Sequence, residues 1–546
     1  MKYSTYFFTR KTSQSERIPG SNQVPNNAGG YAWAIDDWKR LDRFLILGSE
    51  RGTYYGAERE LTQENAEATL RCIKADGRRT VSRIVELSES GRAPKNDPAL
   101  FALALAAALG DEETKRLAWG ALPRVARIGT HLFHFVREYH SLRGWSRTSR
   151  RALAAWYDNK TPEELAYQVA KYQQRDGWSH RDILRLTHPK PQDAAHQEIY
   201  RWIVGKGMPE LCDAGLRLLE GVERAKREHN PEKIAAFVRD YGLTWEMLPT
   251  EALNSATVWE ALLEKMPFTA MVRNLAKMTV VGLVKPLSQA TAHIVARLRD
   301  QKHIQKARAH PIMFLLAMRT YEQGHGEKGK LCWEPVDQIV DALDDAFYLA
   351  FSNVAPTGKR LMLAVDVSGS MAGSMIAGSS LTAREAAAAM ALVTAKTENN
   401  YLVTAFSSAG DERWRAPSGW SFLCNGISLL HISPHQRLTD AVQEVSRLGA
   451  GGTDCALPML YALERKLNVD TFIVYTDSET WAGKIHPAQA LQMYRQKTGV
   501  PAKLVVVGMT STGFSIADPN DPGMIDCVGF DASTPELIGQ FVQGKI

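Results

Sequence analysis

The stretch Leu361-Met-Leu-Ala-Val-Asp-Val-Ser-Gly-Ser-Met371 indicates the fold of the C-terminal part of the chain. Its apolar run ends at Asp366, and hydroxyl side chains follow at alternate positions, at Ser368 and Ser370. The Ala-rich segment Thr382–Thr397 comes next and is typical of a helix. An apolar strand that leads into a loop of oxygen-bearing side chains and then into a helix predicts a ligand site at the end of a β-strand.

Short apolar runs rich in Val, Ile and Leu alternate with helical stretches from this point to the end of the chain. The expected strands are Leu361–Val365, Tyr401–Phe406, Thr471–Tyr475 and Lys503–Gly508. The expected helices are Thr382–Thr397, Leu438–Leu448, Cys455–Lys466, His486–Thr498 and one from Thr534. Because such strands are apolar enough to be buried on both faces, residues 361–546 are predicted to form an α/β domain with a doubly wound, Rossmann-like parallel sheet.

Residues 1–360 have a different pattern, which is predicted to form a separate domain. Apolar residues three and four apart predict helices, among them Asn65–Lys74, Asp97–Leu109, Asp111–Ile128, Pro231–Tyr241, Thr257–Lys265 and Leu287–Lys306. Hardly any strand signal interrupts them, which favours a solenoid-like stack of helix pairs; since no strict sequence period is present, a compact bundle is the alternative. The polar first 35 or so residues are expected to form an arm that lies against another part of the protein.

Charge is unevenly distributed between these two parts. The formal net charge is +6, yet the chain from Leu361 onward contains 13 Lys and Arg against 17 Asp and Glu, so the first part carries the surplus, +10. A polyanionic partner would therefore bind the N-terminal part, and an ordinary solvated basic surface is the alternative. With 45% hydrophobic and 23% charged residues, the composition is that of a globular protein and does not indicate long disordered tails.

The cysteines and the apolar runs bear on the cellular compartment. Six cysteines occur without a Cys-x-x-Cys pair, so they indicate neither a zinc nor a redox centre and are expected to be buried thiols in a reducing compartment. The N-terminus has no secretory signal pattern, and the longest apolar run, Leu100–Leu109, is half of the roughly 20 residues that a membrane span needs. A cytoplasmic protein without membrane contact is expected.

Three segments of the C-terminal part are predicted to form a metal site. Asp366, Ser368 and Ser370 offer a carboxylate and two hydroxyls, ligands suited to a hard divalent cation. Thr453 opens a helix after a Gly-Gly pair, and Asp477 directly follows the strand Thr471–Tyr475. The carboxyl ends of parallel strands meet at one edge of a sheet, so these side chains are expected to converge. A simple Asp-Ser-Gly turn is the alternative.

This combination resembles the metal-ion-dependent adhesion site of von Willebrand factor A domains. The resemblance implies a bound Mg²⁺ with an open coordination position that a partner's carboxylate fills. Asp454 and Ser478 are expected to be outer contacts or alternative ligands. Metal-assisted hydrolysis needs a base, and no histidine or lysine lies near these residues in sequence, so the cation is expected to serve docking and the protein not to be an enzyme.

The segment Trp156–Pro191 predicts two adjacent helices with cationic rows. Thr161-Pro-Glu-Glu164 is a helix start, after which Lys171 and Arg175, four apart, share the face turned away from the apolar stripe. In the second predicted helix, which begins at Ser179, cations line one side; the row comprises Arg181, Arg185 and His188, with Lys190 just beyond Pro189. Such rows suit a nucleic-acid backbone, and a solvated helix face is the alternative.

The sequence Gly177-Trp-Ser-His-Arg-Asp-Ile-Leu-Arg-Leu-Thr-His-Pro-Lys190 resembles the TROVE module found in the Ro autoantigen family and in telomerase- and vault-associated proteins. Further stretches resemble the Ro family: Asn27–Tyr31, Arg43–Ser49, Phe268–Met278, Lys306–Pro311 and Phe514–Pro519. The resemblance covers essentially the whole chain, and its details are similar to those of bacterial members. It implies a monomeric ring of HEAT-like helical repeats closed by the von Willebrand factor A-like domain.

The family also implies two kinds of RNA contact. Small noncoding Y RNAs bind the outer surface of the ring, and single-stranded 3′ ends of misfolded RNAs enter its central hole. Lys171, Arg175 and His188 match the family's Y RNA-binding positions, and His180, Arg181, Arg185 and Lys190 are expected neighbours. Further basic candidates, for which structural pairing is the alternative, are Arg273, Lys277, Arg297 and Arg299.

The sequence therefore predicts a non-enzymatic RNA-binding protein, the core of a small ribonucleoprotein with a Y-like RNA. For a bacterial member the family implies delivery of RNA to a 3′ exoribonuclease such as polynucleotide phosphorylase, in RNA quality control. The competing hypothesis is a protein-interaction adaptor that grips an acidic residue of its partner through the cation at Asp366. A third hypothesis, a nuclease, lacks a candidate base.

Overall fold

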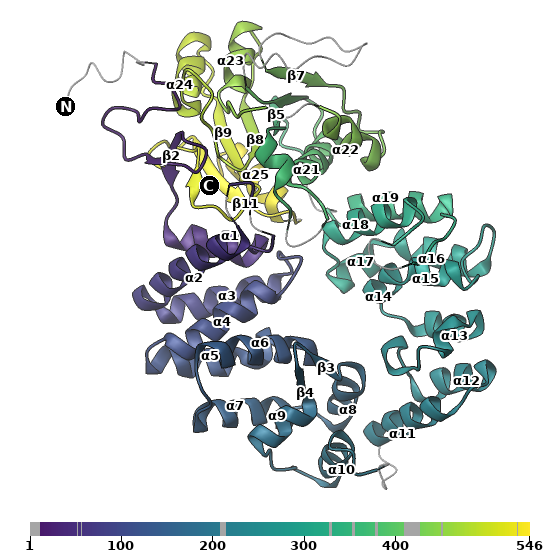
Figure 1. The fold of residues 1–546 in the computed structure, drawn as a ribbon. Helices are drawn as coiled ribbons and strands as arrows, with labels where there is room; N and C mark the ends of the chain where they lie inside the picture. Colours follow the sequence, from purple (N-terminus) through teal and green to yellow (C-terminus); the bar gives the residue numbers. More distant parts are fainter. Residues whose placement is uncertain are drawn as a thin grey trace.

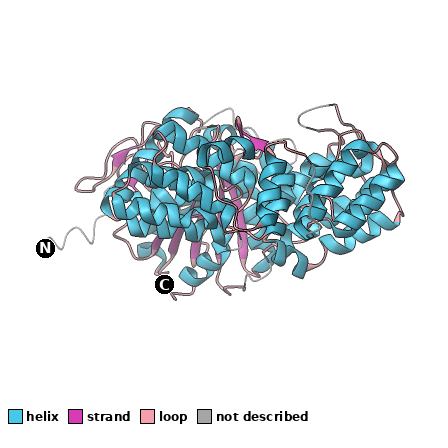
Figure 2. Ribbon diagram, turned by 90° about the horizontal axis from the view of Figure 1, so that it is seen from below, coloured by secondary structure: helices cyan, strands magenta, loops and turns pink. Residues whose placement is uncertain are grey.

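A computed structural model of the chain describes residues 11–51, 53–55, 57–207, 214–326, 330–351, 355–376, 380–408, 426–448, 451–531 and 533–546. The helices of residues 37–349 follow one another along an arc, and the sheet domain lies between the two ends of the arc, so the chain forms a ring (Figure 1). Seen from below, the ring is much flatter than it is wide (Figure 2). This arrangement confirms the predicted fold class of a helical-repeat ring plus an α/β domain.

The N-terminal half of the arc runs from α1 to α10. Its helices are α1 (Asp37–Leu47), α2 (Glu58–Ala75), α3 (Gly77–Ser90), α4 (Asp97–Leu109), α5 (Glu112–Val125), α6 (Gly129–Leu142), α7 (Arg147–Asp158), α8 (Pro162–Lys171), α9 (His180–Thr187) and α10 (Ala194–Ile203). Side-chain caps determine several of the starts; Thr161, for example, accepts a hydrogen bond from the Glu164 backbone N–H at 3.2 Å.

The second half of the arc runs from α11 to α19 and returns to the sheet domain. Its helices are α11 (Ala214–Arg227), α12 (Pro231–Tyr241), α13 (Ala256–Lys265), α14 (Phe268–Arg273), α15 (Leu275–Val280), α16 (Gln289–Leu298), α17 (Gln301–Ala307), α18 (Pro311–Glu322) and α19 (Asp337–Leu349). The prediction of one helix over Leu287–Lys306 was wrong. Asp300 caps a new helix there by accepting from the backbone N–H of Lys302 at 2.8 Å, so α16 and α17 are separate.

The six-stranded sheet has the order β11-β9-β8-β5-β6-β7. Its strands are β5 (Leu361–Asp366), β6 (Tyr401–Phe406), β7 (Ile427–Leu430), β8 (Thr471–Thr476), β9 (Lys503–Gly508) and β11 (Met524–Val528). All neighbours pair in parallel except β7, which pairs with β6 in antiparallel fashion. The sheet is therefore mixed, whereas the sequence predicted a parallel sheet and indicated neither β7 nor β11.

Helices cover both faces of this sheet. They are α20 (Gly369–Gly373), α21 (Ala383–Thr397), α22 (Leu438–Ser446), α23 (Leu457–Glu464), α24 (Pro487–Thr498) and α25 (Ser533–Val542). Side chains alternate along the central strand β5: Leu363 and Val365 join the core that includes α21 and the helical arc, and Met362 and Ala364 join a second core with α23 and α24. One hydrophobic core is thus continuous between the arc and the sheet domain.

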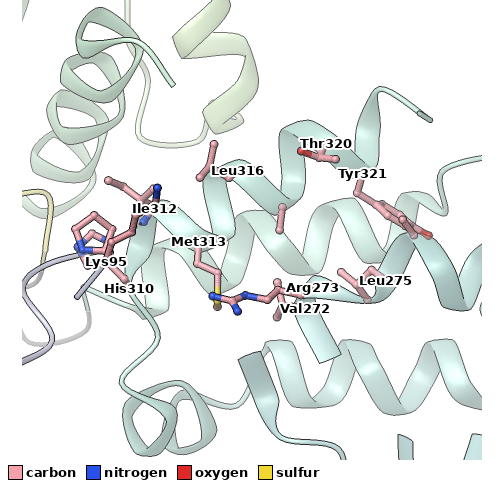
Figure 3. Close-up of a pocket in the computed structure, with 13 residues that line it drawn as sticks. Lys95, Val272, Arg273, Leu275, His310, Ile312, Met313, Leu316, Thr320 and Tyr321 are labelled. Carbon is pink, nitrogen blue, oxygen red and sulfur yellow. Dashed lines mark hydrogen bonds between the residues drawn. The ribbon is translucent and has the colours of Figure 1, made fainter. Parts of the chain in front are cut away.

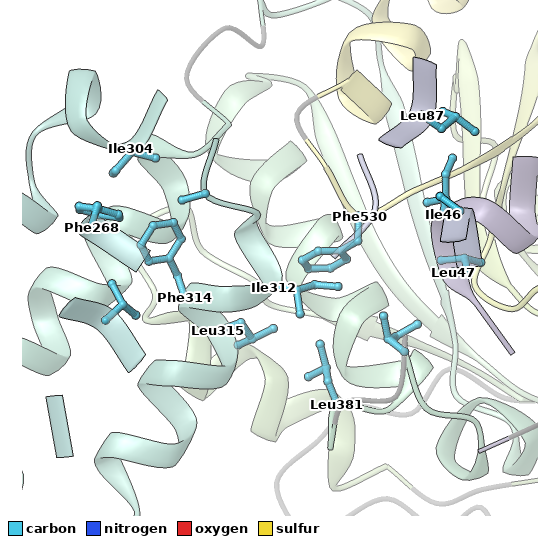
Figure 4. Close-up of a cluster of buried hydrophobic side chains, with 14 of the residues drawn as sticks. Ile46, Leu47, Leu87, Phe268, Ile304, Ile312, Phe314, Leu315, Leu381 and Phe530 are labelled. Carbon is cyan, nitrogen blue, oxygen red and sulfur yellow. The ribbon is translucent and has the colours of Figure 1, made fainter. Parts of the chain in front are cut away.

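Aromatic side chains close the ring where the arc returns to the sheet. Phe530, which follows β11, packs against Phe347 and Phe351 of the α19 region at ring distances of 6.3 and 6.4 Å. Phe530 and Ile46 of α1 belong to the same buried cluster, shown in Figure 4. Both ends of the arc are therefore fixed to the sheet domain by apolar burial.

The segment before α1 is the expected arm, and it lies on the sheet domain. Within it, β1 (Val24–Pro25) pairs with β2 (Tyr31–Ala34), and β2 also pairs with β10 (Phe514–Ser515). Gln14 donates hydrogen bonds to Asp454 Oδ1 at 2.7 Å and to the Ile485 carbonyl at 2.8 Å. The arm thus adds polar contacts beside the carboxyl edge of the sheet.

The thiols and the helices bear on the compartment predictions. Cys72, Cys455 and Cys527 are buried free thiols as expected, but Cys332 is exposed, and the other two cysteines lie outside the described residues. Throughout the residues that the structure describes, each helix is too short or too polar to pass through a lipid bilayer.

Candidate nucleic-acid interface and metal site

The predicted metal-site residues converge at the carboxyl edge of the sheet. Asp366 ends β5, and its Oδ1 accepts from the Ser368 backbone N–H at 2.9 Å while its Oδ2 accepts from Thr476 Oγ1 at 2.6 Å. Ser368 Oγ and Ser370 Oγ lie 3.1 Å apart. Asp477 follows the neighbouring strand β8 and accepts from the Glu479 backbone N–H at 3.1 Å. The side chains of Asp366, Ser368, Ser370 and Asp477 are all buried.

The electrostatics of this edge favour a cation. Burial and then the neighbouring Asp477 raise the pKa of Asp366 to about 7, and burial also raises the pKa of Asp477. Thr453 Oγ1 is buried and has no hydrogen-bond partner among the described residues. A hard divalent cation would relieve both the carboxylate repulsion and the unpaired hydroxyl oxygen. These residues therefore fit Mg²⁺.

Hydroxyl oxygens would have to take part in holding a cation at this edge. The described residues contain no cluster of three or more His, Cys, Asp or Glu side chains able to hold a metal, so hydroxyl oxygens would have to complete the shell. Asp454 Oδ1 accepts from Gln14 and from the Ala456 backbone N–H at 3.0 Å, which directs it toward the arm. The Ser478 hydroxyl is buried without a partner in the described part of the chain.

The predicted cationic residues are exposed at α9. The side chains of Arg181, Arg185, His188 and Lys190 are exposed and make no hydrogen bond or ion pair with other described residues. The His188 backbone caps α9 in the left-handed region, with φ 47°, and its N–H donates to the Leu184 carbonyl at 2.9 Å. We call Arg175, Arg181, Arg185, His188 and Lys190 the α9 cationic surface.

Arg175 belongs to this surface, although not on the predicted helix. Helix α8 ends at Lys171, and Arg175 lies on β3 (Gln174–Arg175), opposite Trp178 of β4 (Trp178–Ser179). Asp176 and Gly177 form the turn between them with φ of 53° and 78°. The Arg175 side chain is 61% exposed, and its Nε lies 3.8 Å from Asp176 Oδ1.

Two other predicted RNA contacts are not exposed on this surface. Lys171 is mostly buried; its Nζ donates to Tyr167 Oη at 3.0 Å and lies 3.6 Å from Glu246 Oε1. His180 is fully inside the repeat, where Nδ1 shares a 2.9 Å hydrogen bond with Tyr157 Oη, and burial lowers its pKa to about 3. His180 was expected to be a neighbour of the Y RNA-binding positions, but helix periodicity turns its side chain toward the core and away from the α9 cationic surface.

The further basic candidates are mostly engaged in structural contacts. Lys277 Nζ donates to Asn254 Oδ1 at 2.9 Å, Arg297 to the Met266 carbonyl at 2.9 Å, and Arg299 pairs with Asp345 at 2.7 Å. Arg273 is different, since it is exposed and lines a cleft of about 400 Å³. In Figure 3 it lies beside Met313, across from Lys95 of the α3–α4 loop, so the cleft lies between the two ends of the arc.

Comparison with known proteins agrees with this geometry. The model of the TROVE domain matches residues 24–235 and 239–320, and the model of the Ro60 vWA domain matches residues 360–542. A relative in Deinococcus radiodurans, the RNA-binding protein RO60, is 40% identical over 536 residues, which cover 98% of this chain and 97% of that protein. The chain belongs to the Ro60 family.

Two further comparisons extend the match. The RNA-binding protein RO60 of Caenorhabditis elegans is 36% identical over 616 residues, covering 98% of this Ro60-family chain and 92% of that protein. The crystal structure of the Deinococcus radiodurans RO (RSR) protein matches with a TM-score of 0.65 at 39% identity, covering 94% of this chain and all of that one. The ring with its closing domain is thus the fold of a known RNA-binding family.

The structure also reveals an aromatic group beside the α9 cationic surface that no local sequence pattern indicates. Trp178 of the β3–β4 hairpin makes edge contacts with Trp145 and His140 at ring distances of 5.8 and 5.6 Å. His140 stacks on Trp145 at 5.3 Å. Aromatic faces next to cations are a frequent feature of nucleic-acid surfaces. Trp178 lies within the quoted TROVE-like stretch, but only the fold brings the other two rings to it.

Proposed function

We propose that this protein is the core of a small cytoplasmic ribonucleoprotein in which a Y-like noncoding RNA binds the outside of the ring at the α9 cationic surface. The observation that supports this most is the set of exposed cations at Arg181, Arg185, His188 and Lys190, which have no acidic partner in the described part of the chain. Unpaired cations in a row favour a phosphate backbone, because each contact releases a counterion. The two relatives named above are RNA-binding proteins.

Single-stranded 3′ ends of misfolded RNA are proposed to bind elsewhere, in the cleft of about 400 Å³ at Arg273. Its floor is apolar, with Met313 and Leu316, and its exposed cation is Arg273, since Lys95 is paired with Glu50 at 2.5 Å. An unpaired base packs on an apolar face and its phosphate pairs with a cation, and the cleft offers both. The resulting particle would hand RNA to a 3′ exoribonuclease such as polynucleotide phosphorylase for quality control, and the ring itself would catalyse nothing.

Gel-shift titrations test both sites. Stem-loop RNA and a single-stranded tail are titrated across a salt series against wild type, Arg181→Ala/Arg185→Ala/His188→Ser, and Arg273→Ala. We expect the triple variant to lose stem-loop affinity and to lower the salt slope by about one unit per lost phosphate contact, with tail binding retained. Arg273→Ala should do the reverse. Unchanged stem-loop binding by the triple variant would refute the surface assignment.

A matched control removes two permanent cations and one histidine from the sheet domain. Arg447, Lys466 and His435 are exposed there, so Arg447→Ala/Lys466→Ala/His435→Ser changes net charge equally and should leave both RNAs bound. For the exoribonuclease, RNA-dependent co-precipitation of polynucleotide phosphorylase is the test. If the two proteins still co-precipitate after ribonuclease treatment, or do not co-precipitate although RNA is present, delivery through RNA is contradicted.

A second candidate function, a cation-dependent protein-interaction adaptor, rests on the metal site. The buried Thr453 hydroxyl without a described partner and the two buried carboxylates Asp366 and Asp477 support Mg²⁺ binding there. Isothermal titration with Mg²⁺ should show one site in wild type and none in Asp366→Ala/Asp477→Ala. Equal binding by the double variant would refute the site.

A further inference from the structure

Exposed aromatic side chains gather around the candidate metal site. Among the described residues, the large apolar side chains that are exposed include just three aromatic ones: Tyr54 at 60%, Tyr55 at 36% and Trp481 at 41%. Tyr54 and Tyr55 contact each other edge-on with ring centroids 5.0 Å apart. Exposed tyrosine and tryptophan side chains are more typical of binding surfaces than of solvated ones.

Tyr54 lies against the helix that carries Ser370. Its backbone N–H donates to Ser374 Oγ at 3.3 Å, and a Cβ added to Gly373 of α20 would come within 2.7 Å of its ring. Tyr55 is held beside it by the edge-on contact between the two rings. Both tyrosines therefore stand at one side of the metal site.

Trp481 stands over the loop that carries Thr453. Its backbone N–H donates to the Thr453 carbonyl at 3.1 Å, and a Cβ added to Gly452 would come within 2.7 Å of the indole ring. Each aromatic group is thus attached to a segment that holds a predicted metal-site residue. The tyrosines come from the α1–α2 loop of the helical arc and the tryptophan from the sheet domain, so the surface exists only in the closed ring.

The charge at this edge indicates which kind of partner fits. Four acidic side chains lie there, Asp366, Asp454, Asp477 and Glu479, and all are buried. Asp366 and Asp477 would have to be ionised to hold a divalent cation, which would then neutralise this pair and leave no surplus positive charge for a polyanion, whereas a single carboxylate can fill one coordination position. The helical part carries the basic surplus of the chain and offers RNA a better surface.

We propose that Tyr54, Tyr55 and Trp481 form an aromatic rim that docks a protein segment with one Asp or Glu side chain next to an apolar side chain. The acidic side chain binds the cation, and the apolar neighbour packs on the rim. The inference rests on the metal site proposed above and adds the composition of the partner and the residues that select it. Apolar packing beside a charge-assisted contact would give specificity that the cation alone lacks.

A displayed library of random peptides, selected on the full-length protein in Mg²⁺ and eluted with EDTA, tests this inference. We expect the eluted peptides to share an acidic residue flanked by Leu, Ile, Phe or Trp. A synthetic peptide from this set should bind Tyr54→Ala/Tyr55→Ala/Trp481→Ala at least about tenfold more weakly than wild type. The control Leu109→Ala/Val280→Ala, which removes exposed apolar side chains elsewhere, should bind it normally.

Mg²⁺ titration of the same variants separates failure of the rim from failure of the metal site. The rim variant should bind Mg²⁺ as wild type does; if wild type binds no Mg²⁺, the metal site itself is refuted and the rim proposal with it. Normal Mg²⁺ binding together with peptides that lack an acidic residue, or that bind the rim variant equally well, would overturn the rim proposal alone. Loss of oligouridylate binding in the rim variant would identify the surface as an RNA site instead.

Discussion

Removing the ion pair between Arg43 and Asp526 should open the junction between the helical arc and the sheet domain. Arg43 of α1 is 1% exposed and Asp526 of β11 is 6% exposed, and the Arg43 Nη2 lies 2.6 Å from Asp526 Oδ2. Arg43 Nη1 also donates to the carbonyls of Thr512 at 3.0 Å and Phe514 at 2.9 Å. Breaking a buried pair by removing one partner typically destabilises by about 3–5 kcal/mol.

The two single variants should differ within that range. Asp526→Ala leaves the guanidinium with its two carbonyl acceptors, so we expect about 3 kcal/mol; Arg43→Met leaves a buried carboxylate and two carbonyls without donors, so we expect about 5 kcal/mol. Hydrogen exchange of the β11 amides is the appropriate assay, because a chain of two domains need not unfold in one step. The measured quantity is the opening free energy of β11.

An exposed pair that also involves α1 is the control. Arg71 of α2 and Asp37 of α1 make two hydrogen bonds of 2.9 and 2.8 Å, but their side chains are 52% and 36% exposed. Arg71→Met should therefore change stability by less than about 1 kcal/mol. If Arg43→Met and Asp526→Ala lower the β11 opening free energy no more than this control does, the buried pair does not fasten the ring.

Three further predictions concern the metal, acid and the arm. Mg²⁺ at a hundred times its dissociation constant should stabilise the wild-type protein by about 2.7 kcal/mol and so raise its melting temperature in calorimetry. The melting temperature of Asp366→Ala/Asp477→Ala should not change. Burial lowers the pKa of His180 from an ordinary 6.5 to about 3. Between these pH values the imidazole binds a proton only in the unfolded chain, so the free energy of unfolding falls as the pH drops below about 6.5. His180→Phe should therefore flatten the dependence of the urea midpoint on pH between about 6.5 and 4, and an unchanged slope would refute the assignment. A Cβ on Gly30 would lie 1.9 Å from the Thr480 carbonyl, so Gly30→Ala should release the arm to trypsin, whereas Gly144→Ala, with nothing within 4 Å, should not.

Local sequence patterns predicted the structure correctly where it depends on residues that are neighbours in the chain. The strand that ends at Asp366 and the one that precedes Asp477 could be predicted because each is a short apolar run, and parallel pairing then brings their ends together. The capping residue Thr161 likewise placed the start of α8 correctly. The metal-site residues therefore converge as predicted, although their role as ligands stays a prediction.

Predictions from helical spacing were wrong where tertiary contacts or turns override the periodicity. Helical spacing placed Arg175 on α8, but the positive φ angles at Asp176 and Gly177 turn the chain into a hairpin instead. Lys171 was predicted to be a surface cation from its helical spacing. The structure places it beside Glu246, which lies far along the chain, so no local pattern indicated this contact. The rim residues Tyr54 and Trp481 lie in different domains, so no local signal could have joined them.

Ultraviolet cross-linking of RNA to the native protein, followed by mass-spectrometric mapping of the linked residues, would show where RNA binds. We expect a small structured RNA to co-purify and its cross-links to fall within residues 174–190, at the β3–β4 hairpin and α9. Native protein without RNA, or cross-links confined to the sheet domain, would contradict the assignment of the α9 cationic surface as the site of a ribonucleoprotein.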